Sequence, residues 1–425
     1  MPAREQVSYF GAGPARLPTS VLANASAALL NYNNTGLGIA EHSHRSALSS
    51  NILTQAAQYF KTLLNIPNDD SYTVIFMQGG GTTQFSSVVY NLVGYWVERR
   101  LRKHGGDLEK VRADLKDMKC EYLLTGGWSL KASQEAARLL GDEHVSIVID
   151  ARKANGGKWG IIPEEKDWSL VEKKDSALAY FCDNETVDGV EFPSFPNALE
   201  SAEGEEDERL VIGDMSSNIL SRPVDAKKYA VIFAGAQKNI GTTGITIVLI
   251  RKSILDCQPS PVTLRALNLP IPPIMMHYPT LASSSSLYNT LPIFDVYIAG
   301  EVMSQLLTSG GVAAIAAAAE RKSSSVYEVI DKNPTVFTPV ITDTRVRSRM
   351  NVCFRLVKGK DGRDLEKQFF EEAEKKGLLG IKGHRSVGGG RISCYNAVGE
   401  EEVAKLVAFM KEFATKQGHT YLTLN

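Results

Sequence analysis

The most informative segment of this 425-residue chain is Ala230-Val231-Ile232-Phe233-Ala234-Gly235-Ala236-Gln237-Lys238-Asn239-Ile240-Gly241. An apolar run ends in small residues and is followed by a single lysine, Lys238, and then by glycine. The pattern predicts a buried strand that delivers Lys238 to a site of low dielectric, where burial favours the neutral, nucleophilic amine. The same residues also suit a strand whose end is capped by a solvated lysine.

Similar strands are predicted on both sides of this one along the chain. Residues 210–213 form an apolar run that ends in Asp214, and residues 245–250 form another run rich in β-branched side chains. Further runs alternate with segments of helical periodicity and lie at 72–77, 122–124, 145–149 and 177–182. This alternation predicts an α/β fold with a mostly parallel sheet, whose functional groups gather at the carboxyl ends of the strands.

A run of three glycines separates the strand predicted at 72–77 from a helix predicted at 84–97. The intervening residues are Gln78-Gly79-Gly80-Gly81-Thr82-Thr83. A strand, a glycine loop and a helix in this order present backbone N–H groups and the positive end of a helix to a phosphate. The spacing is neither that of a Walker loop nor that of a dinucleotide fingerprint, and a tight turn explains the glycines equally well.

Other predicted strands end in residues that suit one cofactor. Trp128 and Thr186 each follow a predicted strand, and Trp128 would either fill the core or offer a flat face to a ring. With the glycine loop, Asp214 and Lys238, these strand ends supply a phosphate cradle, an aromatic plate, a hydroxyl, a carboxylate and an amine. Pyridoxal 5′-phosphate (PLP) requires this set of groups.

Length and composition restrict the class of protein. The chain exceeds the usual size of a single core, so we expect two domains. Its net charge of −1 gives no electrostatic case for nucleic-acid or membrane binding, and we find no pattern of a targeting segment or membrane span. Its five scattered cysteines argue against a disulfide framework and a structural zinc site, so we expect no metal and a cytoplasmic location.

The chain changes character after Arg251, where a proline-rich stretch begins. The elements predicted beyond it are helices at 294–307, 312–330, 364–376 and 400–417 and a strand at 349–356. We therefore expect a large domain over residues 17–300. A smaller α+β domain is expected over residues 301–425, together with residues 1–16.

Four motifs resemble those of one enzyme family. They are residues 184–190 (NETVDGV), 214–223 (DMSSNILSRP), 234–241 (AGAQKNIG) and 383–389 (GHRSVGG). The chain resembles the phosphoserine aminotransferases, a class V family of fold-type I PLP enzymes. The resemblance runs in order from Phe10 to the last predicted helix. The resemblance implies a large domain with a mostly parallel seven-stranded sheet and a smaller α+β C-terminal domain.

The resemblance also implies a role for each strand-end residue. Lys238 would form the Schiff base with PLP and move a proton during the reaction, and Asp214 would pair with the pyridinium nitrogen. Trp128 would stack on the ring, and Thr186 would bond the 3-oxygen. The cofactor phosphate would be held by Gly81, Thr82 and Gln237 and, from the neighbouring subunit of a homodimer, by Asn289 and Thr290.

The substrates implied by the resemblance are L-glutamate and 3-phosphohydroxypyruvate, which would give 2-oxoglutarate and O-phospho-L-serine in serine biosynthesis. Arg391 would bind the α-carboxylate, because its planar fork suits a carboxylate. Residues 41–46 hold two histidines and an arginine, which alone would suit a solvated helix start or an anion site. The resemblance implies that the substrate phosphate and the side-chain carboxylate are bound by His44, Arg45, His384 and Arg385.

Two alternatives remain open. Another fold-type I enzyme, such as an alanine–glyoxylate aminotransferase or a cysteine desulfurase, would keep Asp214 and Lys238 without needing the paired histidine–arginine clusters. A desulfurase would also need a catalytic cysteine on a flexible loop, and no cysteine lies in an evident glycine-flanked loop. A non-catalytic phosphate-binding scaffold is the alternative from a different class.

Overall fold

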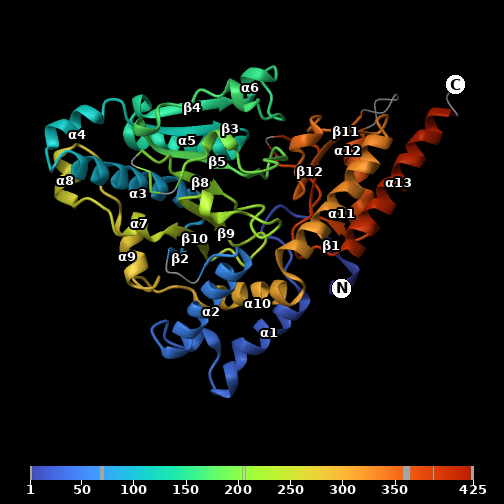
Figure 1. Cartoon of the computed structure of the whole chain (residues 1–425). Coiled ribbons are helices and arrows are strands. Elements are labelled where there is room, and N and C mark those ends of the chain that lie inside the picture. The colour runs from blue at the N-terminus through green and yellow to red at the C-terminus, as the bar shows by residue number, and fades with distance from the viewer. Residues whose placement is uncertain are drawn as a thin grey trace.

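The computed structural model describes residues 2–67, 71–202, 204–205, 207–357, 364–385 and 387–422. Its centre is a seven-stranded sheet with the strand order β2-β10-β9-β8-β5-β3-β4 (Figure 1). Neighbouring strands are parallel except at β10, which is antiparallel to both β2 and β9. The strands are β2 (Tyr72–Met77), β3 (Lys119–Leu124), β4 (Val145–Asp150), β5 (Ser176–Cys182), β8 (Val211–Asp214), β9 (Val231–Gly235) and β10 (Thr246–Arg251). The predicted mostly parallel, seven-stranded sheet is confirmed.

Helices cover both faces of this sheet. On β9, Ile232 and Ala234 join one buried cluster, whereas Val231 and Phe233 join the other. Because the central strands are buried on both faces, they appear in the sequence as continuous apolar runs. The first cluster includes residues of α1 (Thr19–Leu30), α2 (Ala47–Leu63) and α10 (Ile293–Thr308), and the second includes residues of α3 (Gly80–Lys103) and α5 (Gly127–Leu140).

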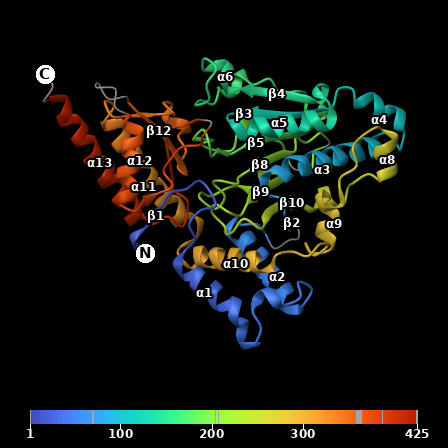
Figure 2. The ribbon, with the colours of Figure 1, turned by 180° about the vertical axis from the view of Figure 1, so that it is seen from behind.

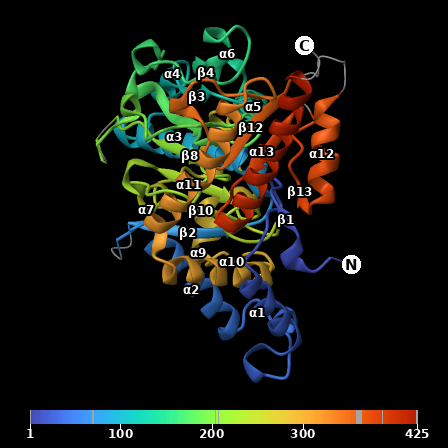
Figure 3. The same cartoon turned by 90° about the vertical axis from the view of Figure 1, so that its right-hand side faces the viewer.

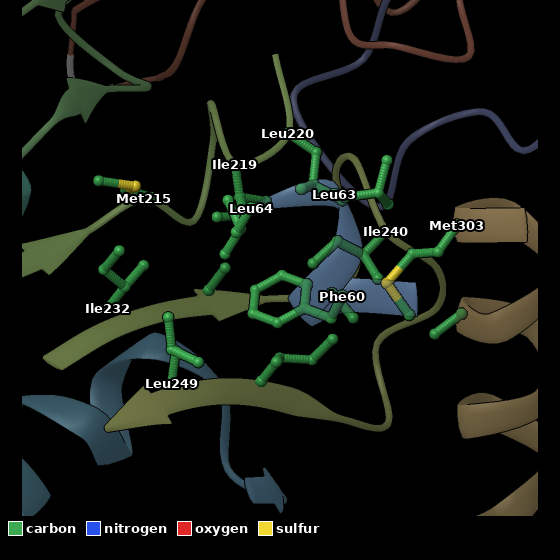
Figure 4. Close-up of a cluster of buried hydrophobic side chains, with 14 of the residues drawn as sticks. Phe60, Leu63, Leu64, Met215, Ile219, Leu220, Ile232, Ile240, Leu249 and Met303 are labelled. Atoms are coloured by element: carbon green, nitrogen blue, oxygen red, sulfur yellow. The ribbon is translucent and has the colours of Figure 1, made fainter. Parts of the chain in front are cut away.

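Figure 4 shows part of the first cluster. Phe60 of α2 lies between Ile232 and Leu249 of the sheet on one side and Met303 of α10 on the other, and Leu63 of α2 belongs to the same cluster. All five side chains are buried, and each contributes about 1.5–3 kcal/mol of hydrophobic free energy. This packing holds β9 in place up to the point where the chain leaves it for Lys238.

A second group of elements lies beside the sheet in opposite views (Figures 1 and 2) and in front of it in Figure 3. It contains an antiparallel sheet and three helices around a core with Phe337, Phe354 and Phe369. Its elements are α11 (Gly311–Lys332), β11 (Phe337–Pro339), β12 (Asn351–Leu356), α12 (Leu365–Lys375), β14 (Gly390–Ser393) and α13 (Glu400–Leu422). The predicted domain division at residue 300 falls within α10, and the domain boundaries stay a prediction.

The N-terminal strand pairs with this second group. β1 (Ser8–Tyr9) is parallel to β13 (Leu378–Leu379), and Phe10 packs in the same core as Phe369. The remaining short elements are α4 (Leu108–Asp114), α6 (Ala151–Ala154), β6 (Asn184–Glu185), β7 (Val190–Glu191), α7 (Lys252–Leu255), α8 (Pro261–Ala266) and α9 (Tyr278–Ser283).

In the described ranges no single helix is long and apolar enough to cross a membrane. Only α10 and α11 pass by length and composition when taken as a pair, and they are bent by 86°.

Candidate active site

A cavity of about 330 Å³ opens where β8 and β9 end. Asp214 is the last residue of β8, and Lys238 follows Gly235, the last residue of β9, by three positions. The fold therefore brings residues from distant parts of the sequence to one edge of the sheet. Of the residues that we expected at the site, those that line this cavity are Gly81, Thr82, Trp128, Thr186, Asp214, Gln237, Lys238, His384 and Arg391.

The Lys238 amine is held by a hydrogen bond. Its Nζ donates to Thr186 Oγ1 at 2.7 Å. Burial lowers the pKa of Lys238 to about 8, although the Asp214 carboxylate opposes this shift. At pH 7 about a tenth of this lysine is therefore neutral and able to act as a nucleophile, far more than of a lysine with its ordinary pKa.

Asp214 is buried with both carboxylate oxygens occupied. Its Oδ1 accepts hydrogen bonds from the Ser216 hydroxyl at 2.6 Å and from the Ser216 N–H at 3.0 Å, and Oδ2 accepts one from the Tyr180 hydroxyl at 3.0 Å. The pKa of Asp214 is raised, because burial outweighs the opposite effects of these hydrogen bonds and of the Lys238 charge. We had not expected Ser216 or Tyr180 at the site. Ser216 follows the aspartate by two positions, a turn signal that the sequence does contain.

The glycine run forms the start of helix α3. Gly79 and Gly80 have φ angles of 105° and 68°, which favour glycine, and the helix begins at Gly80 with no side-chain cap. This start is earlier than the predicted residue 84, because the glycines form the first turn themselves. Gly80, Gly81 and Thr82 line the cavity, so the uncapped positive end of α3 faces it.

The start of helix α5, in contrast, is capped by buried carboxylates. Glu185 Oε2 accepts from the Trp128 N–H at 2.9 Å, and Oε1 accepts from the N–H and hydroxyl of Ser129 at 2.8 and 2.6 Å. Asp188 accepts from the Gly127 N–H at 2.8 Å. Burial and the nearby Asp188 raise the pKa of Glu185 to about 7, whereas the hydrogen bonds lower it. These contacts fix the turn that carries Trp128 next to the strand end that carries Thr186.

Two basic side chains reach the cavity from the second group of elements. Arg391 lies on β14, and its Nη1 donates to the Thr186 carbonyl at 3.4 Å. Its buried Nε has no hydrogen-bond partner among the described residues, and neither has the buried Nε1 of Trp128. The pKa of His384 is lowered by burial and by the positive charges of Arg391, Arg385 and Lys131. This side of the cavity is therefore positively charged.

The other expected residues do not line this cavity. Arg385 is exposed next to His384, and Arg45, Asn289 and Thr290 are exposed elsewhere. The Asn289 amide donates to Gln78 Oε1 at 2.8 Å. His44 is half-buried, and its Nε2 has no hydrogen-bond partner in the part of the chain that the structure describes.

The N-terminal segment also contributes to the cavity, which sequence reasoning missed. Ala12 and Gly13 line it, and the Ala15 N–H donates to the Gln237 carbonyl at 2.8 Å. Gly13 has a φ angle of 121°, and a Cβ atom there would lie 3.3 Å from Lys238 Cγ. The glycine and proline residues of this segment marked it as irregular, but they gave no sign of where it would pack.

Comparison with known proteins identifies the family. Residues 7–100 and 149–406 match the family model of class-V aminotransferases. The phosphoserine aminotransferase of Saccharomyces cerevisiae is 44% identical to this chain over 97% of this chain and 98% of its own. This chain belongs to the phosphoserine aminotransferase family. The phosphoserine aminotransferase of Hahella chejuensis is 39% identical over 95% of this chain and 97% of its own.

Solved structures of phosphoserine aminotransferases share the fold of this family member. The structure from Bacillus circulans subsp. alkalophilus has a TM-score of 0.80 at 34% identity and covers 96% of this chain and 98% of its own. A PLP-bound structure from Trichomonas vaginalis has a TM-score of 0.78 at 34% identity and covers 95% of this chain and 99% of its own. The predicted fold-type I architecture and the predicted family are both confirmed.

Changing Glu185 to glutamine tests how the start of α5 is held. In Glu185→Gln an NH₂ group replaces one acceptor oxygen, so the N–H groups of Trp128 and Ser129 cannot both be satisfied. We expect the free energy of unfolding to fall by about 1–3 kcal/mol and the Trp128 amide to exchange faster. Denaturant unfolding and hydrogen exchange measure these effects. The control is Glu172→Gln, an exposed position, and unchanged exchange at Trp128 in Glu185→Gln would contradict this account.

Proposed function

We propose that this chain is a PLP-dependent aminotransferase. It transfers the amino group of L-glutamate to 3-phosphohydroxypyruvate and forms 2-oxoglutarate and O-phospho-L-serine, a step of serine biosynthesis. Family membership supports the reaction class. The single observation that carries the site assignment is the desolvated Lys238 amine, hydrogen-bonded to Thr186 in a cavity that Asp214 also lines.

The residues of the cavity fit PLP. Burial leaves Trp128 Nε1 and Arg391 Nε without partners in the described chain, which suits a site completed by a polar ligand. The uncapped start of α3 suits a phosphate. Gly81, Thr82 and Gln237 would hold that phosphate, Trp128 would stack on the ring, and Thr186 would donate to its 3-oxygen.

Asp214 and Lys238 would act on the two ends of the cofactor ring. Asp214 would pair with the ring nitrogen, because Ser216 and Tyr180 already hold the carboxylate in one orientation. When bound, PLP supplies an aldehyde that condenses with amines and a ring that withdraws electrons from the bonds at the substrate Cα.

The reaction also depends on proton transfer by this chain. Lys238 Nζ accepts the proton that leaves Cα of glutamate and later returns a proton to Cα of the second substrate. Because its pKa is lowered to about 8, the amine can carry out both steps near neutral pH. Arg391 binds the α-carboxylate as a bidentate fork, so that Cα is presented to Lys238.

The cysteines bear on the desulfurase alternative. All five are free and buried. Cys182 lines the cavity, but burial raises the pKa of its thiol well above the ordinary value, which leaves it a poor nucleophile. The geometry thus favours transamination over sulfur transfer.

We also propose a cytoplasmic location, which free cysteines suit because a reducing compartment keeps thiols unpaired.

The pH dependence of PLP loading tests the role of Lys238. Only the neutral amine attacks the aldehyde, so the rate of PLP attachment to the apoenzyme should rise about tenfold per pH unit and level off above about pH 8. A lysine with its ordinary pKa of 10.5 would show no such plateau. Stopped-flow absorbance measures the rate. Lys238→Ala should lose the absorbance band of lysine-bound PLP, and Lys228→Ala should keep it.

Substrate preference tests the proposed reaction. With glutamate as donor, we expect kcat/KM for 3-phosphohydroxypyruvate to exceed that for hydroxypyruvate at least about a hundredfold, because a site built for a phosphate is left unpaired without it. A coupled assay of 2-oxoglutarate measures both. Arg385→Ala should reduce this preference while PLP loading is retained. Equal activity on both keto acids would refute the substrate assignment.

We further propose a homodimer in which Asn289 and Thr290 reach the cofactor phosphate of the neighbouring subunit. Both residues are exposed and absent from the cavity of their own chain, and Tyr288 beside them is a large, exposed aromatic side chain. An exposed apolar side chain next to exposed polar side chains suits a subunit interface.

Mixing two inactive variants tests this arrangement. In dimers formed from Lys238→Ala and Asn289→Ala/Thr290→Ala chains, one of the two sites would combine intact groups from both chains. We expect recovery of about a quarter of the wild-type activity per chain after random mixing, because half of the dimers are mixed and each has one complete site. If Asn289 and Thr290 act on their own chain, no activity returns.

A further inference from the structure

Lys131 lies next to the cavity on the first turns of α5. It follows Trp128 by three positions, so the two side chains share a face of the helix. Its Nζ lies 4.4 Å from the centre of the Trp128 ring. The side chain is exposed, and no carboxylate of the described residues lies within 4.0 Å of its amine. A cation–π contact leaves the three N–H donors of an ammonium group available to a ligand.

Lys131 is one of three positive charges that act on His384. Its charge acts on His384 together with those of Arg385 and Arg391, although these residues belong to a different group of elements. Arg385 is exposed, and His384 and Arg391 line the cavity. Lys131 thus lies beside Trp128, which lines the cavity together with His384 and Arg391.

The acidic groups nearby are already engaged. Glu185 accepts three hydrogen bonds from Trp128 and Ser129, and Asp188 accepts one from Gly127. Both are buried and point at backbone N–H groups of the same helix that carries Lys131. The local carboxylates therefore fix the position of Lys131 without forming an ion pair with it, and its charge remains available to an anion.

We propose that Lys131 is a further binding residue for the phosphate group of the substrate, facing His384 and Arg385 across the entrance to the cavity. This inference rests on the proposed function, because it assigns the ligand of that same site to a phosphate monoester. Lys131 supplies a mobile point charge from α5, which complements the planar guanidinium groups on the opposite side.

Steady-state kinetics of the PLP-loaded enzyme test this role. In Lys131→Gln, at saturating glutamate, KM for 3-phosphohydroxypyruvate should rise roughly two- to fivefold with kcat little changed, the range of one partly exposed ion pair. KM for hydroxypyruvate should stay the same. Inorganic phosphate, used as a competitive inhibitor, should weaken by a similar factor. Lys131→Arg should restore most of the loss, and Lys405→Gln, an exposed lysine on α13, is the matched control.

A second readout separates binding from support of the Trp128 ring. Loss of the Lys131 charge should raise the pKa of His384, which the charges of Lys131, Arg385 and Arg391 lower. NMR titration of the histidine ring measures it. Equal rises in KM for both keto acids, or an unchanged KM for the phosphorylated one, would overturn the proposal. If the wild-type enzyme itself shows no preference for the phosphorylated keto acid, the proposed function fails instead.

Discussion

The constraint on which this structure depends is the burial of one lysine amine at the end of a parallel strand pair. An ammonium group taken out of water is costly, and the fold offsets this cost with Thr186 as a hydrogen-bond partner and with the charge of Asp214. β8 and β9 are adjacent and parallel, so the two residues emerge at the same edge. At any other pair of strand ends, the Lys238 amine and the Asp214 carboxylate would no longer lie close together.

Two helices begin at this edge, and their starts are used differently. α3 begins in glycines without a side-chain cap, so its positive end faces the cavity. The first N–H groups of α5 are instead taken by Glu185 and Asp188. A free helix start suits a phosphate, whereas a filled one holds the aromatic plate rigidly. The N–H groups at a helix start thus have two uses here: those of α3 suit an anion, and those of α5 hold Trp128 in place.

The second group of elements is held against the sheet by buried polar contacts. Glu191 accepts from the Arg349 guanidinium at 2.8 Å, and the Asn184 amide donates to Asn351 Oδ1 at 2.8 Å. Glu191 is buried, and the charges of Arg222 and Arg349 outweigh its desolvation and lower its pKa. Breaking such a pair would leave a charge unpaired in the interior. These contacts hold the side of the cavity that carries Arg391 and His384 in place relative to Lys238.

The alternating strands, the apolar cores and the residues at the strand ends can all be predicted from the sequence, because each is encoded by a local pattern. The resemblance supplied the roles of Lys238 and Asp214. Which strand ends meet became clear from the folded chain alone. It placed Tyr180 on Asp214, Gly13 against Lys238, and Glu185 under Trp128. These contacts join residues far apart in the chain and depend on strand order and on the path of an irregular segment, neither of which leaves a periodic signal. The Lys238 stretch marked the centre of the site; its burial and its partners came from the packing of the whole chain.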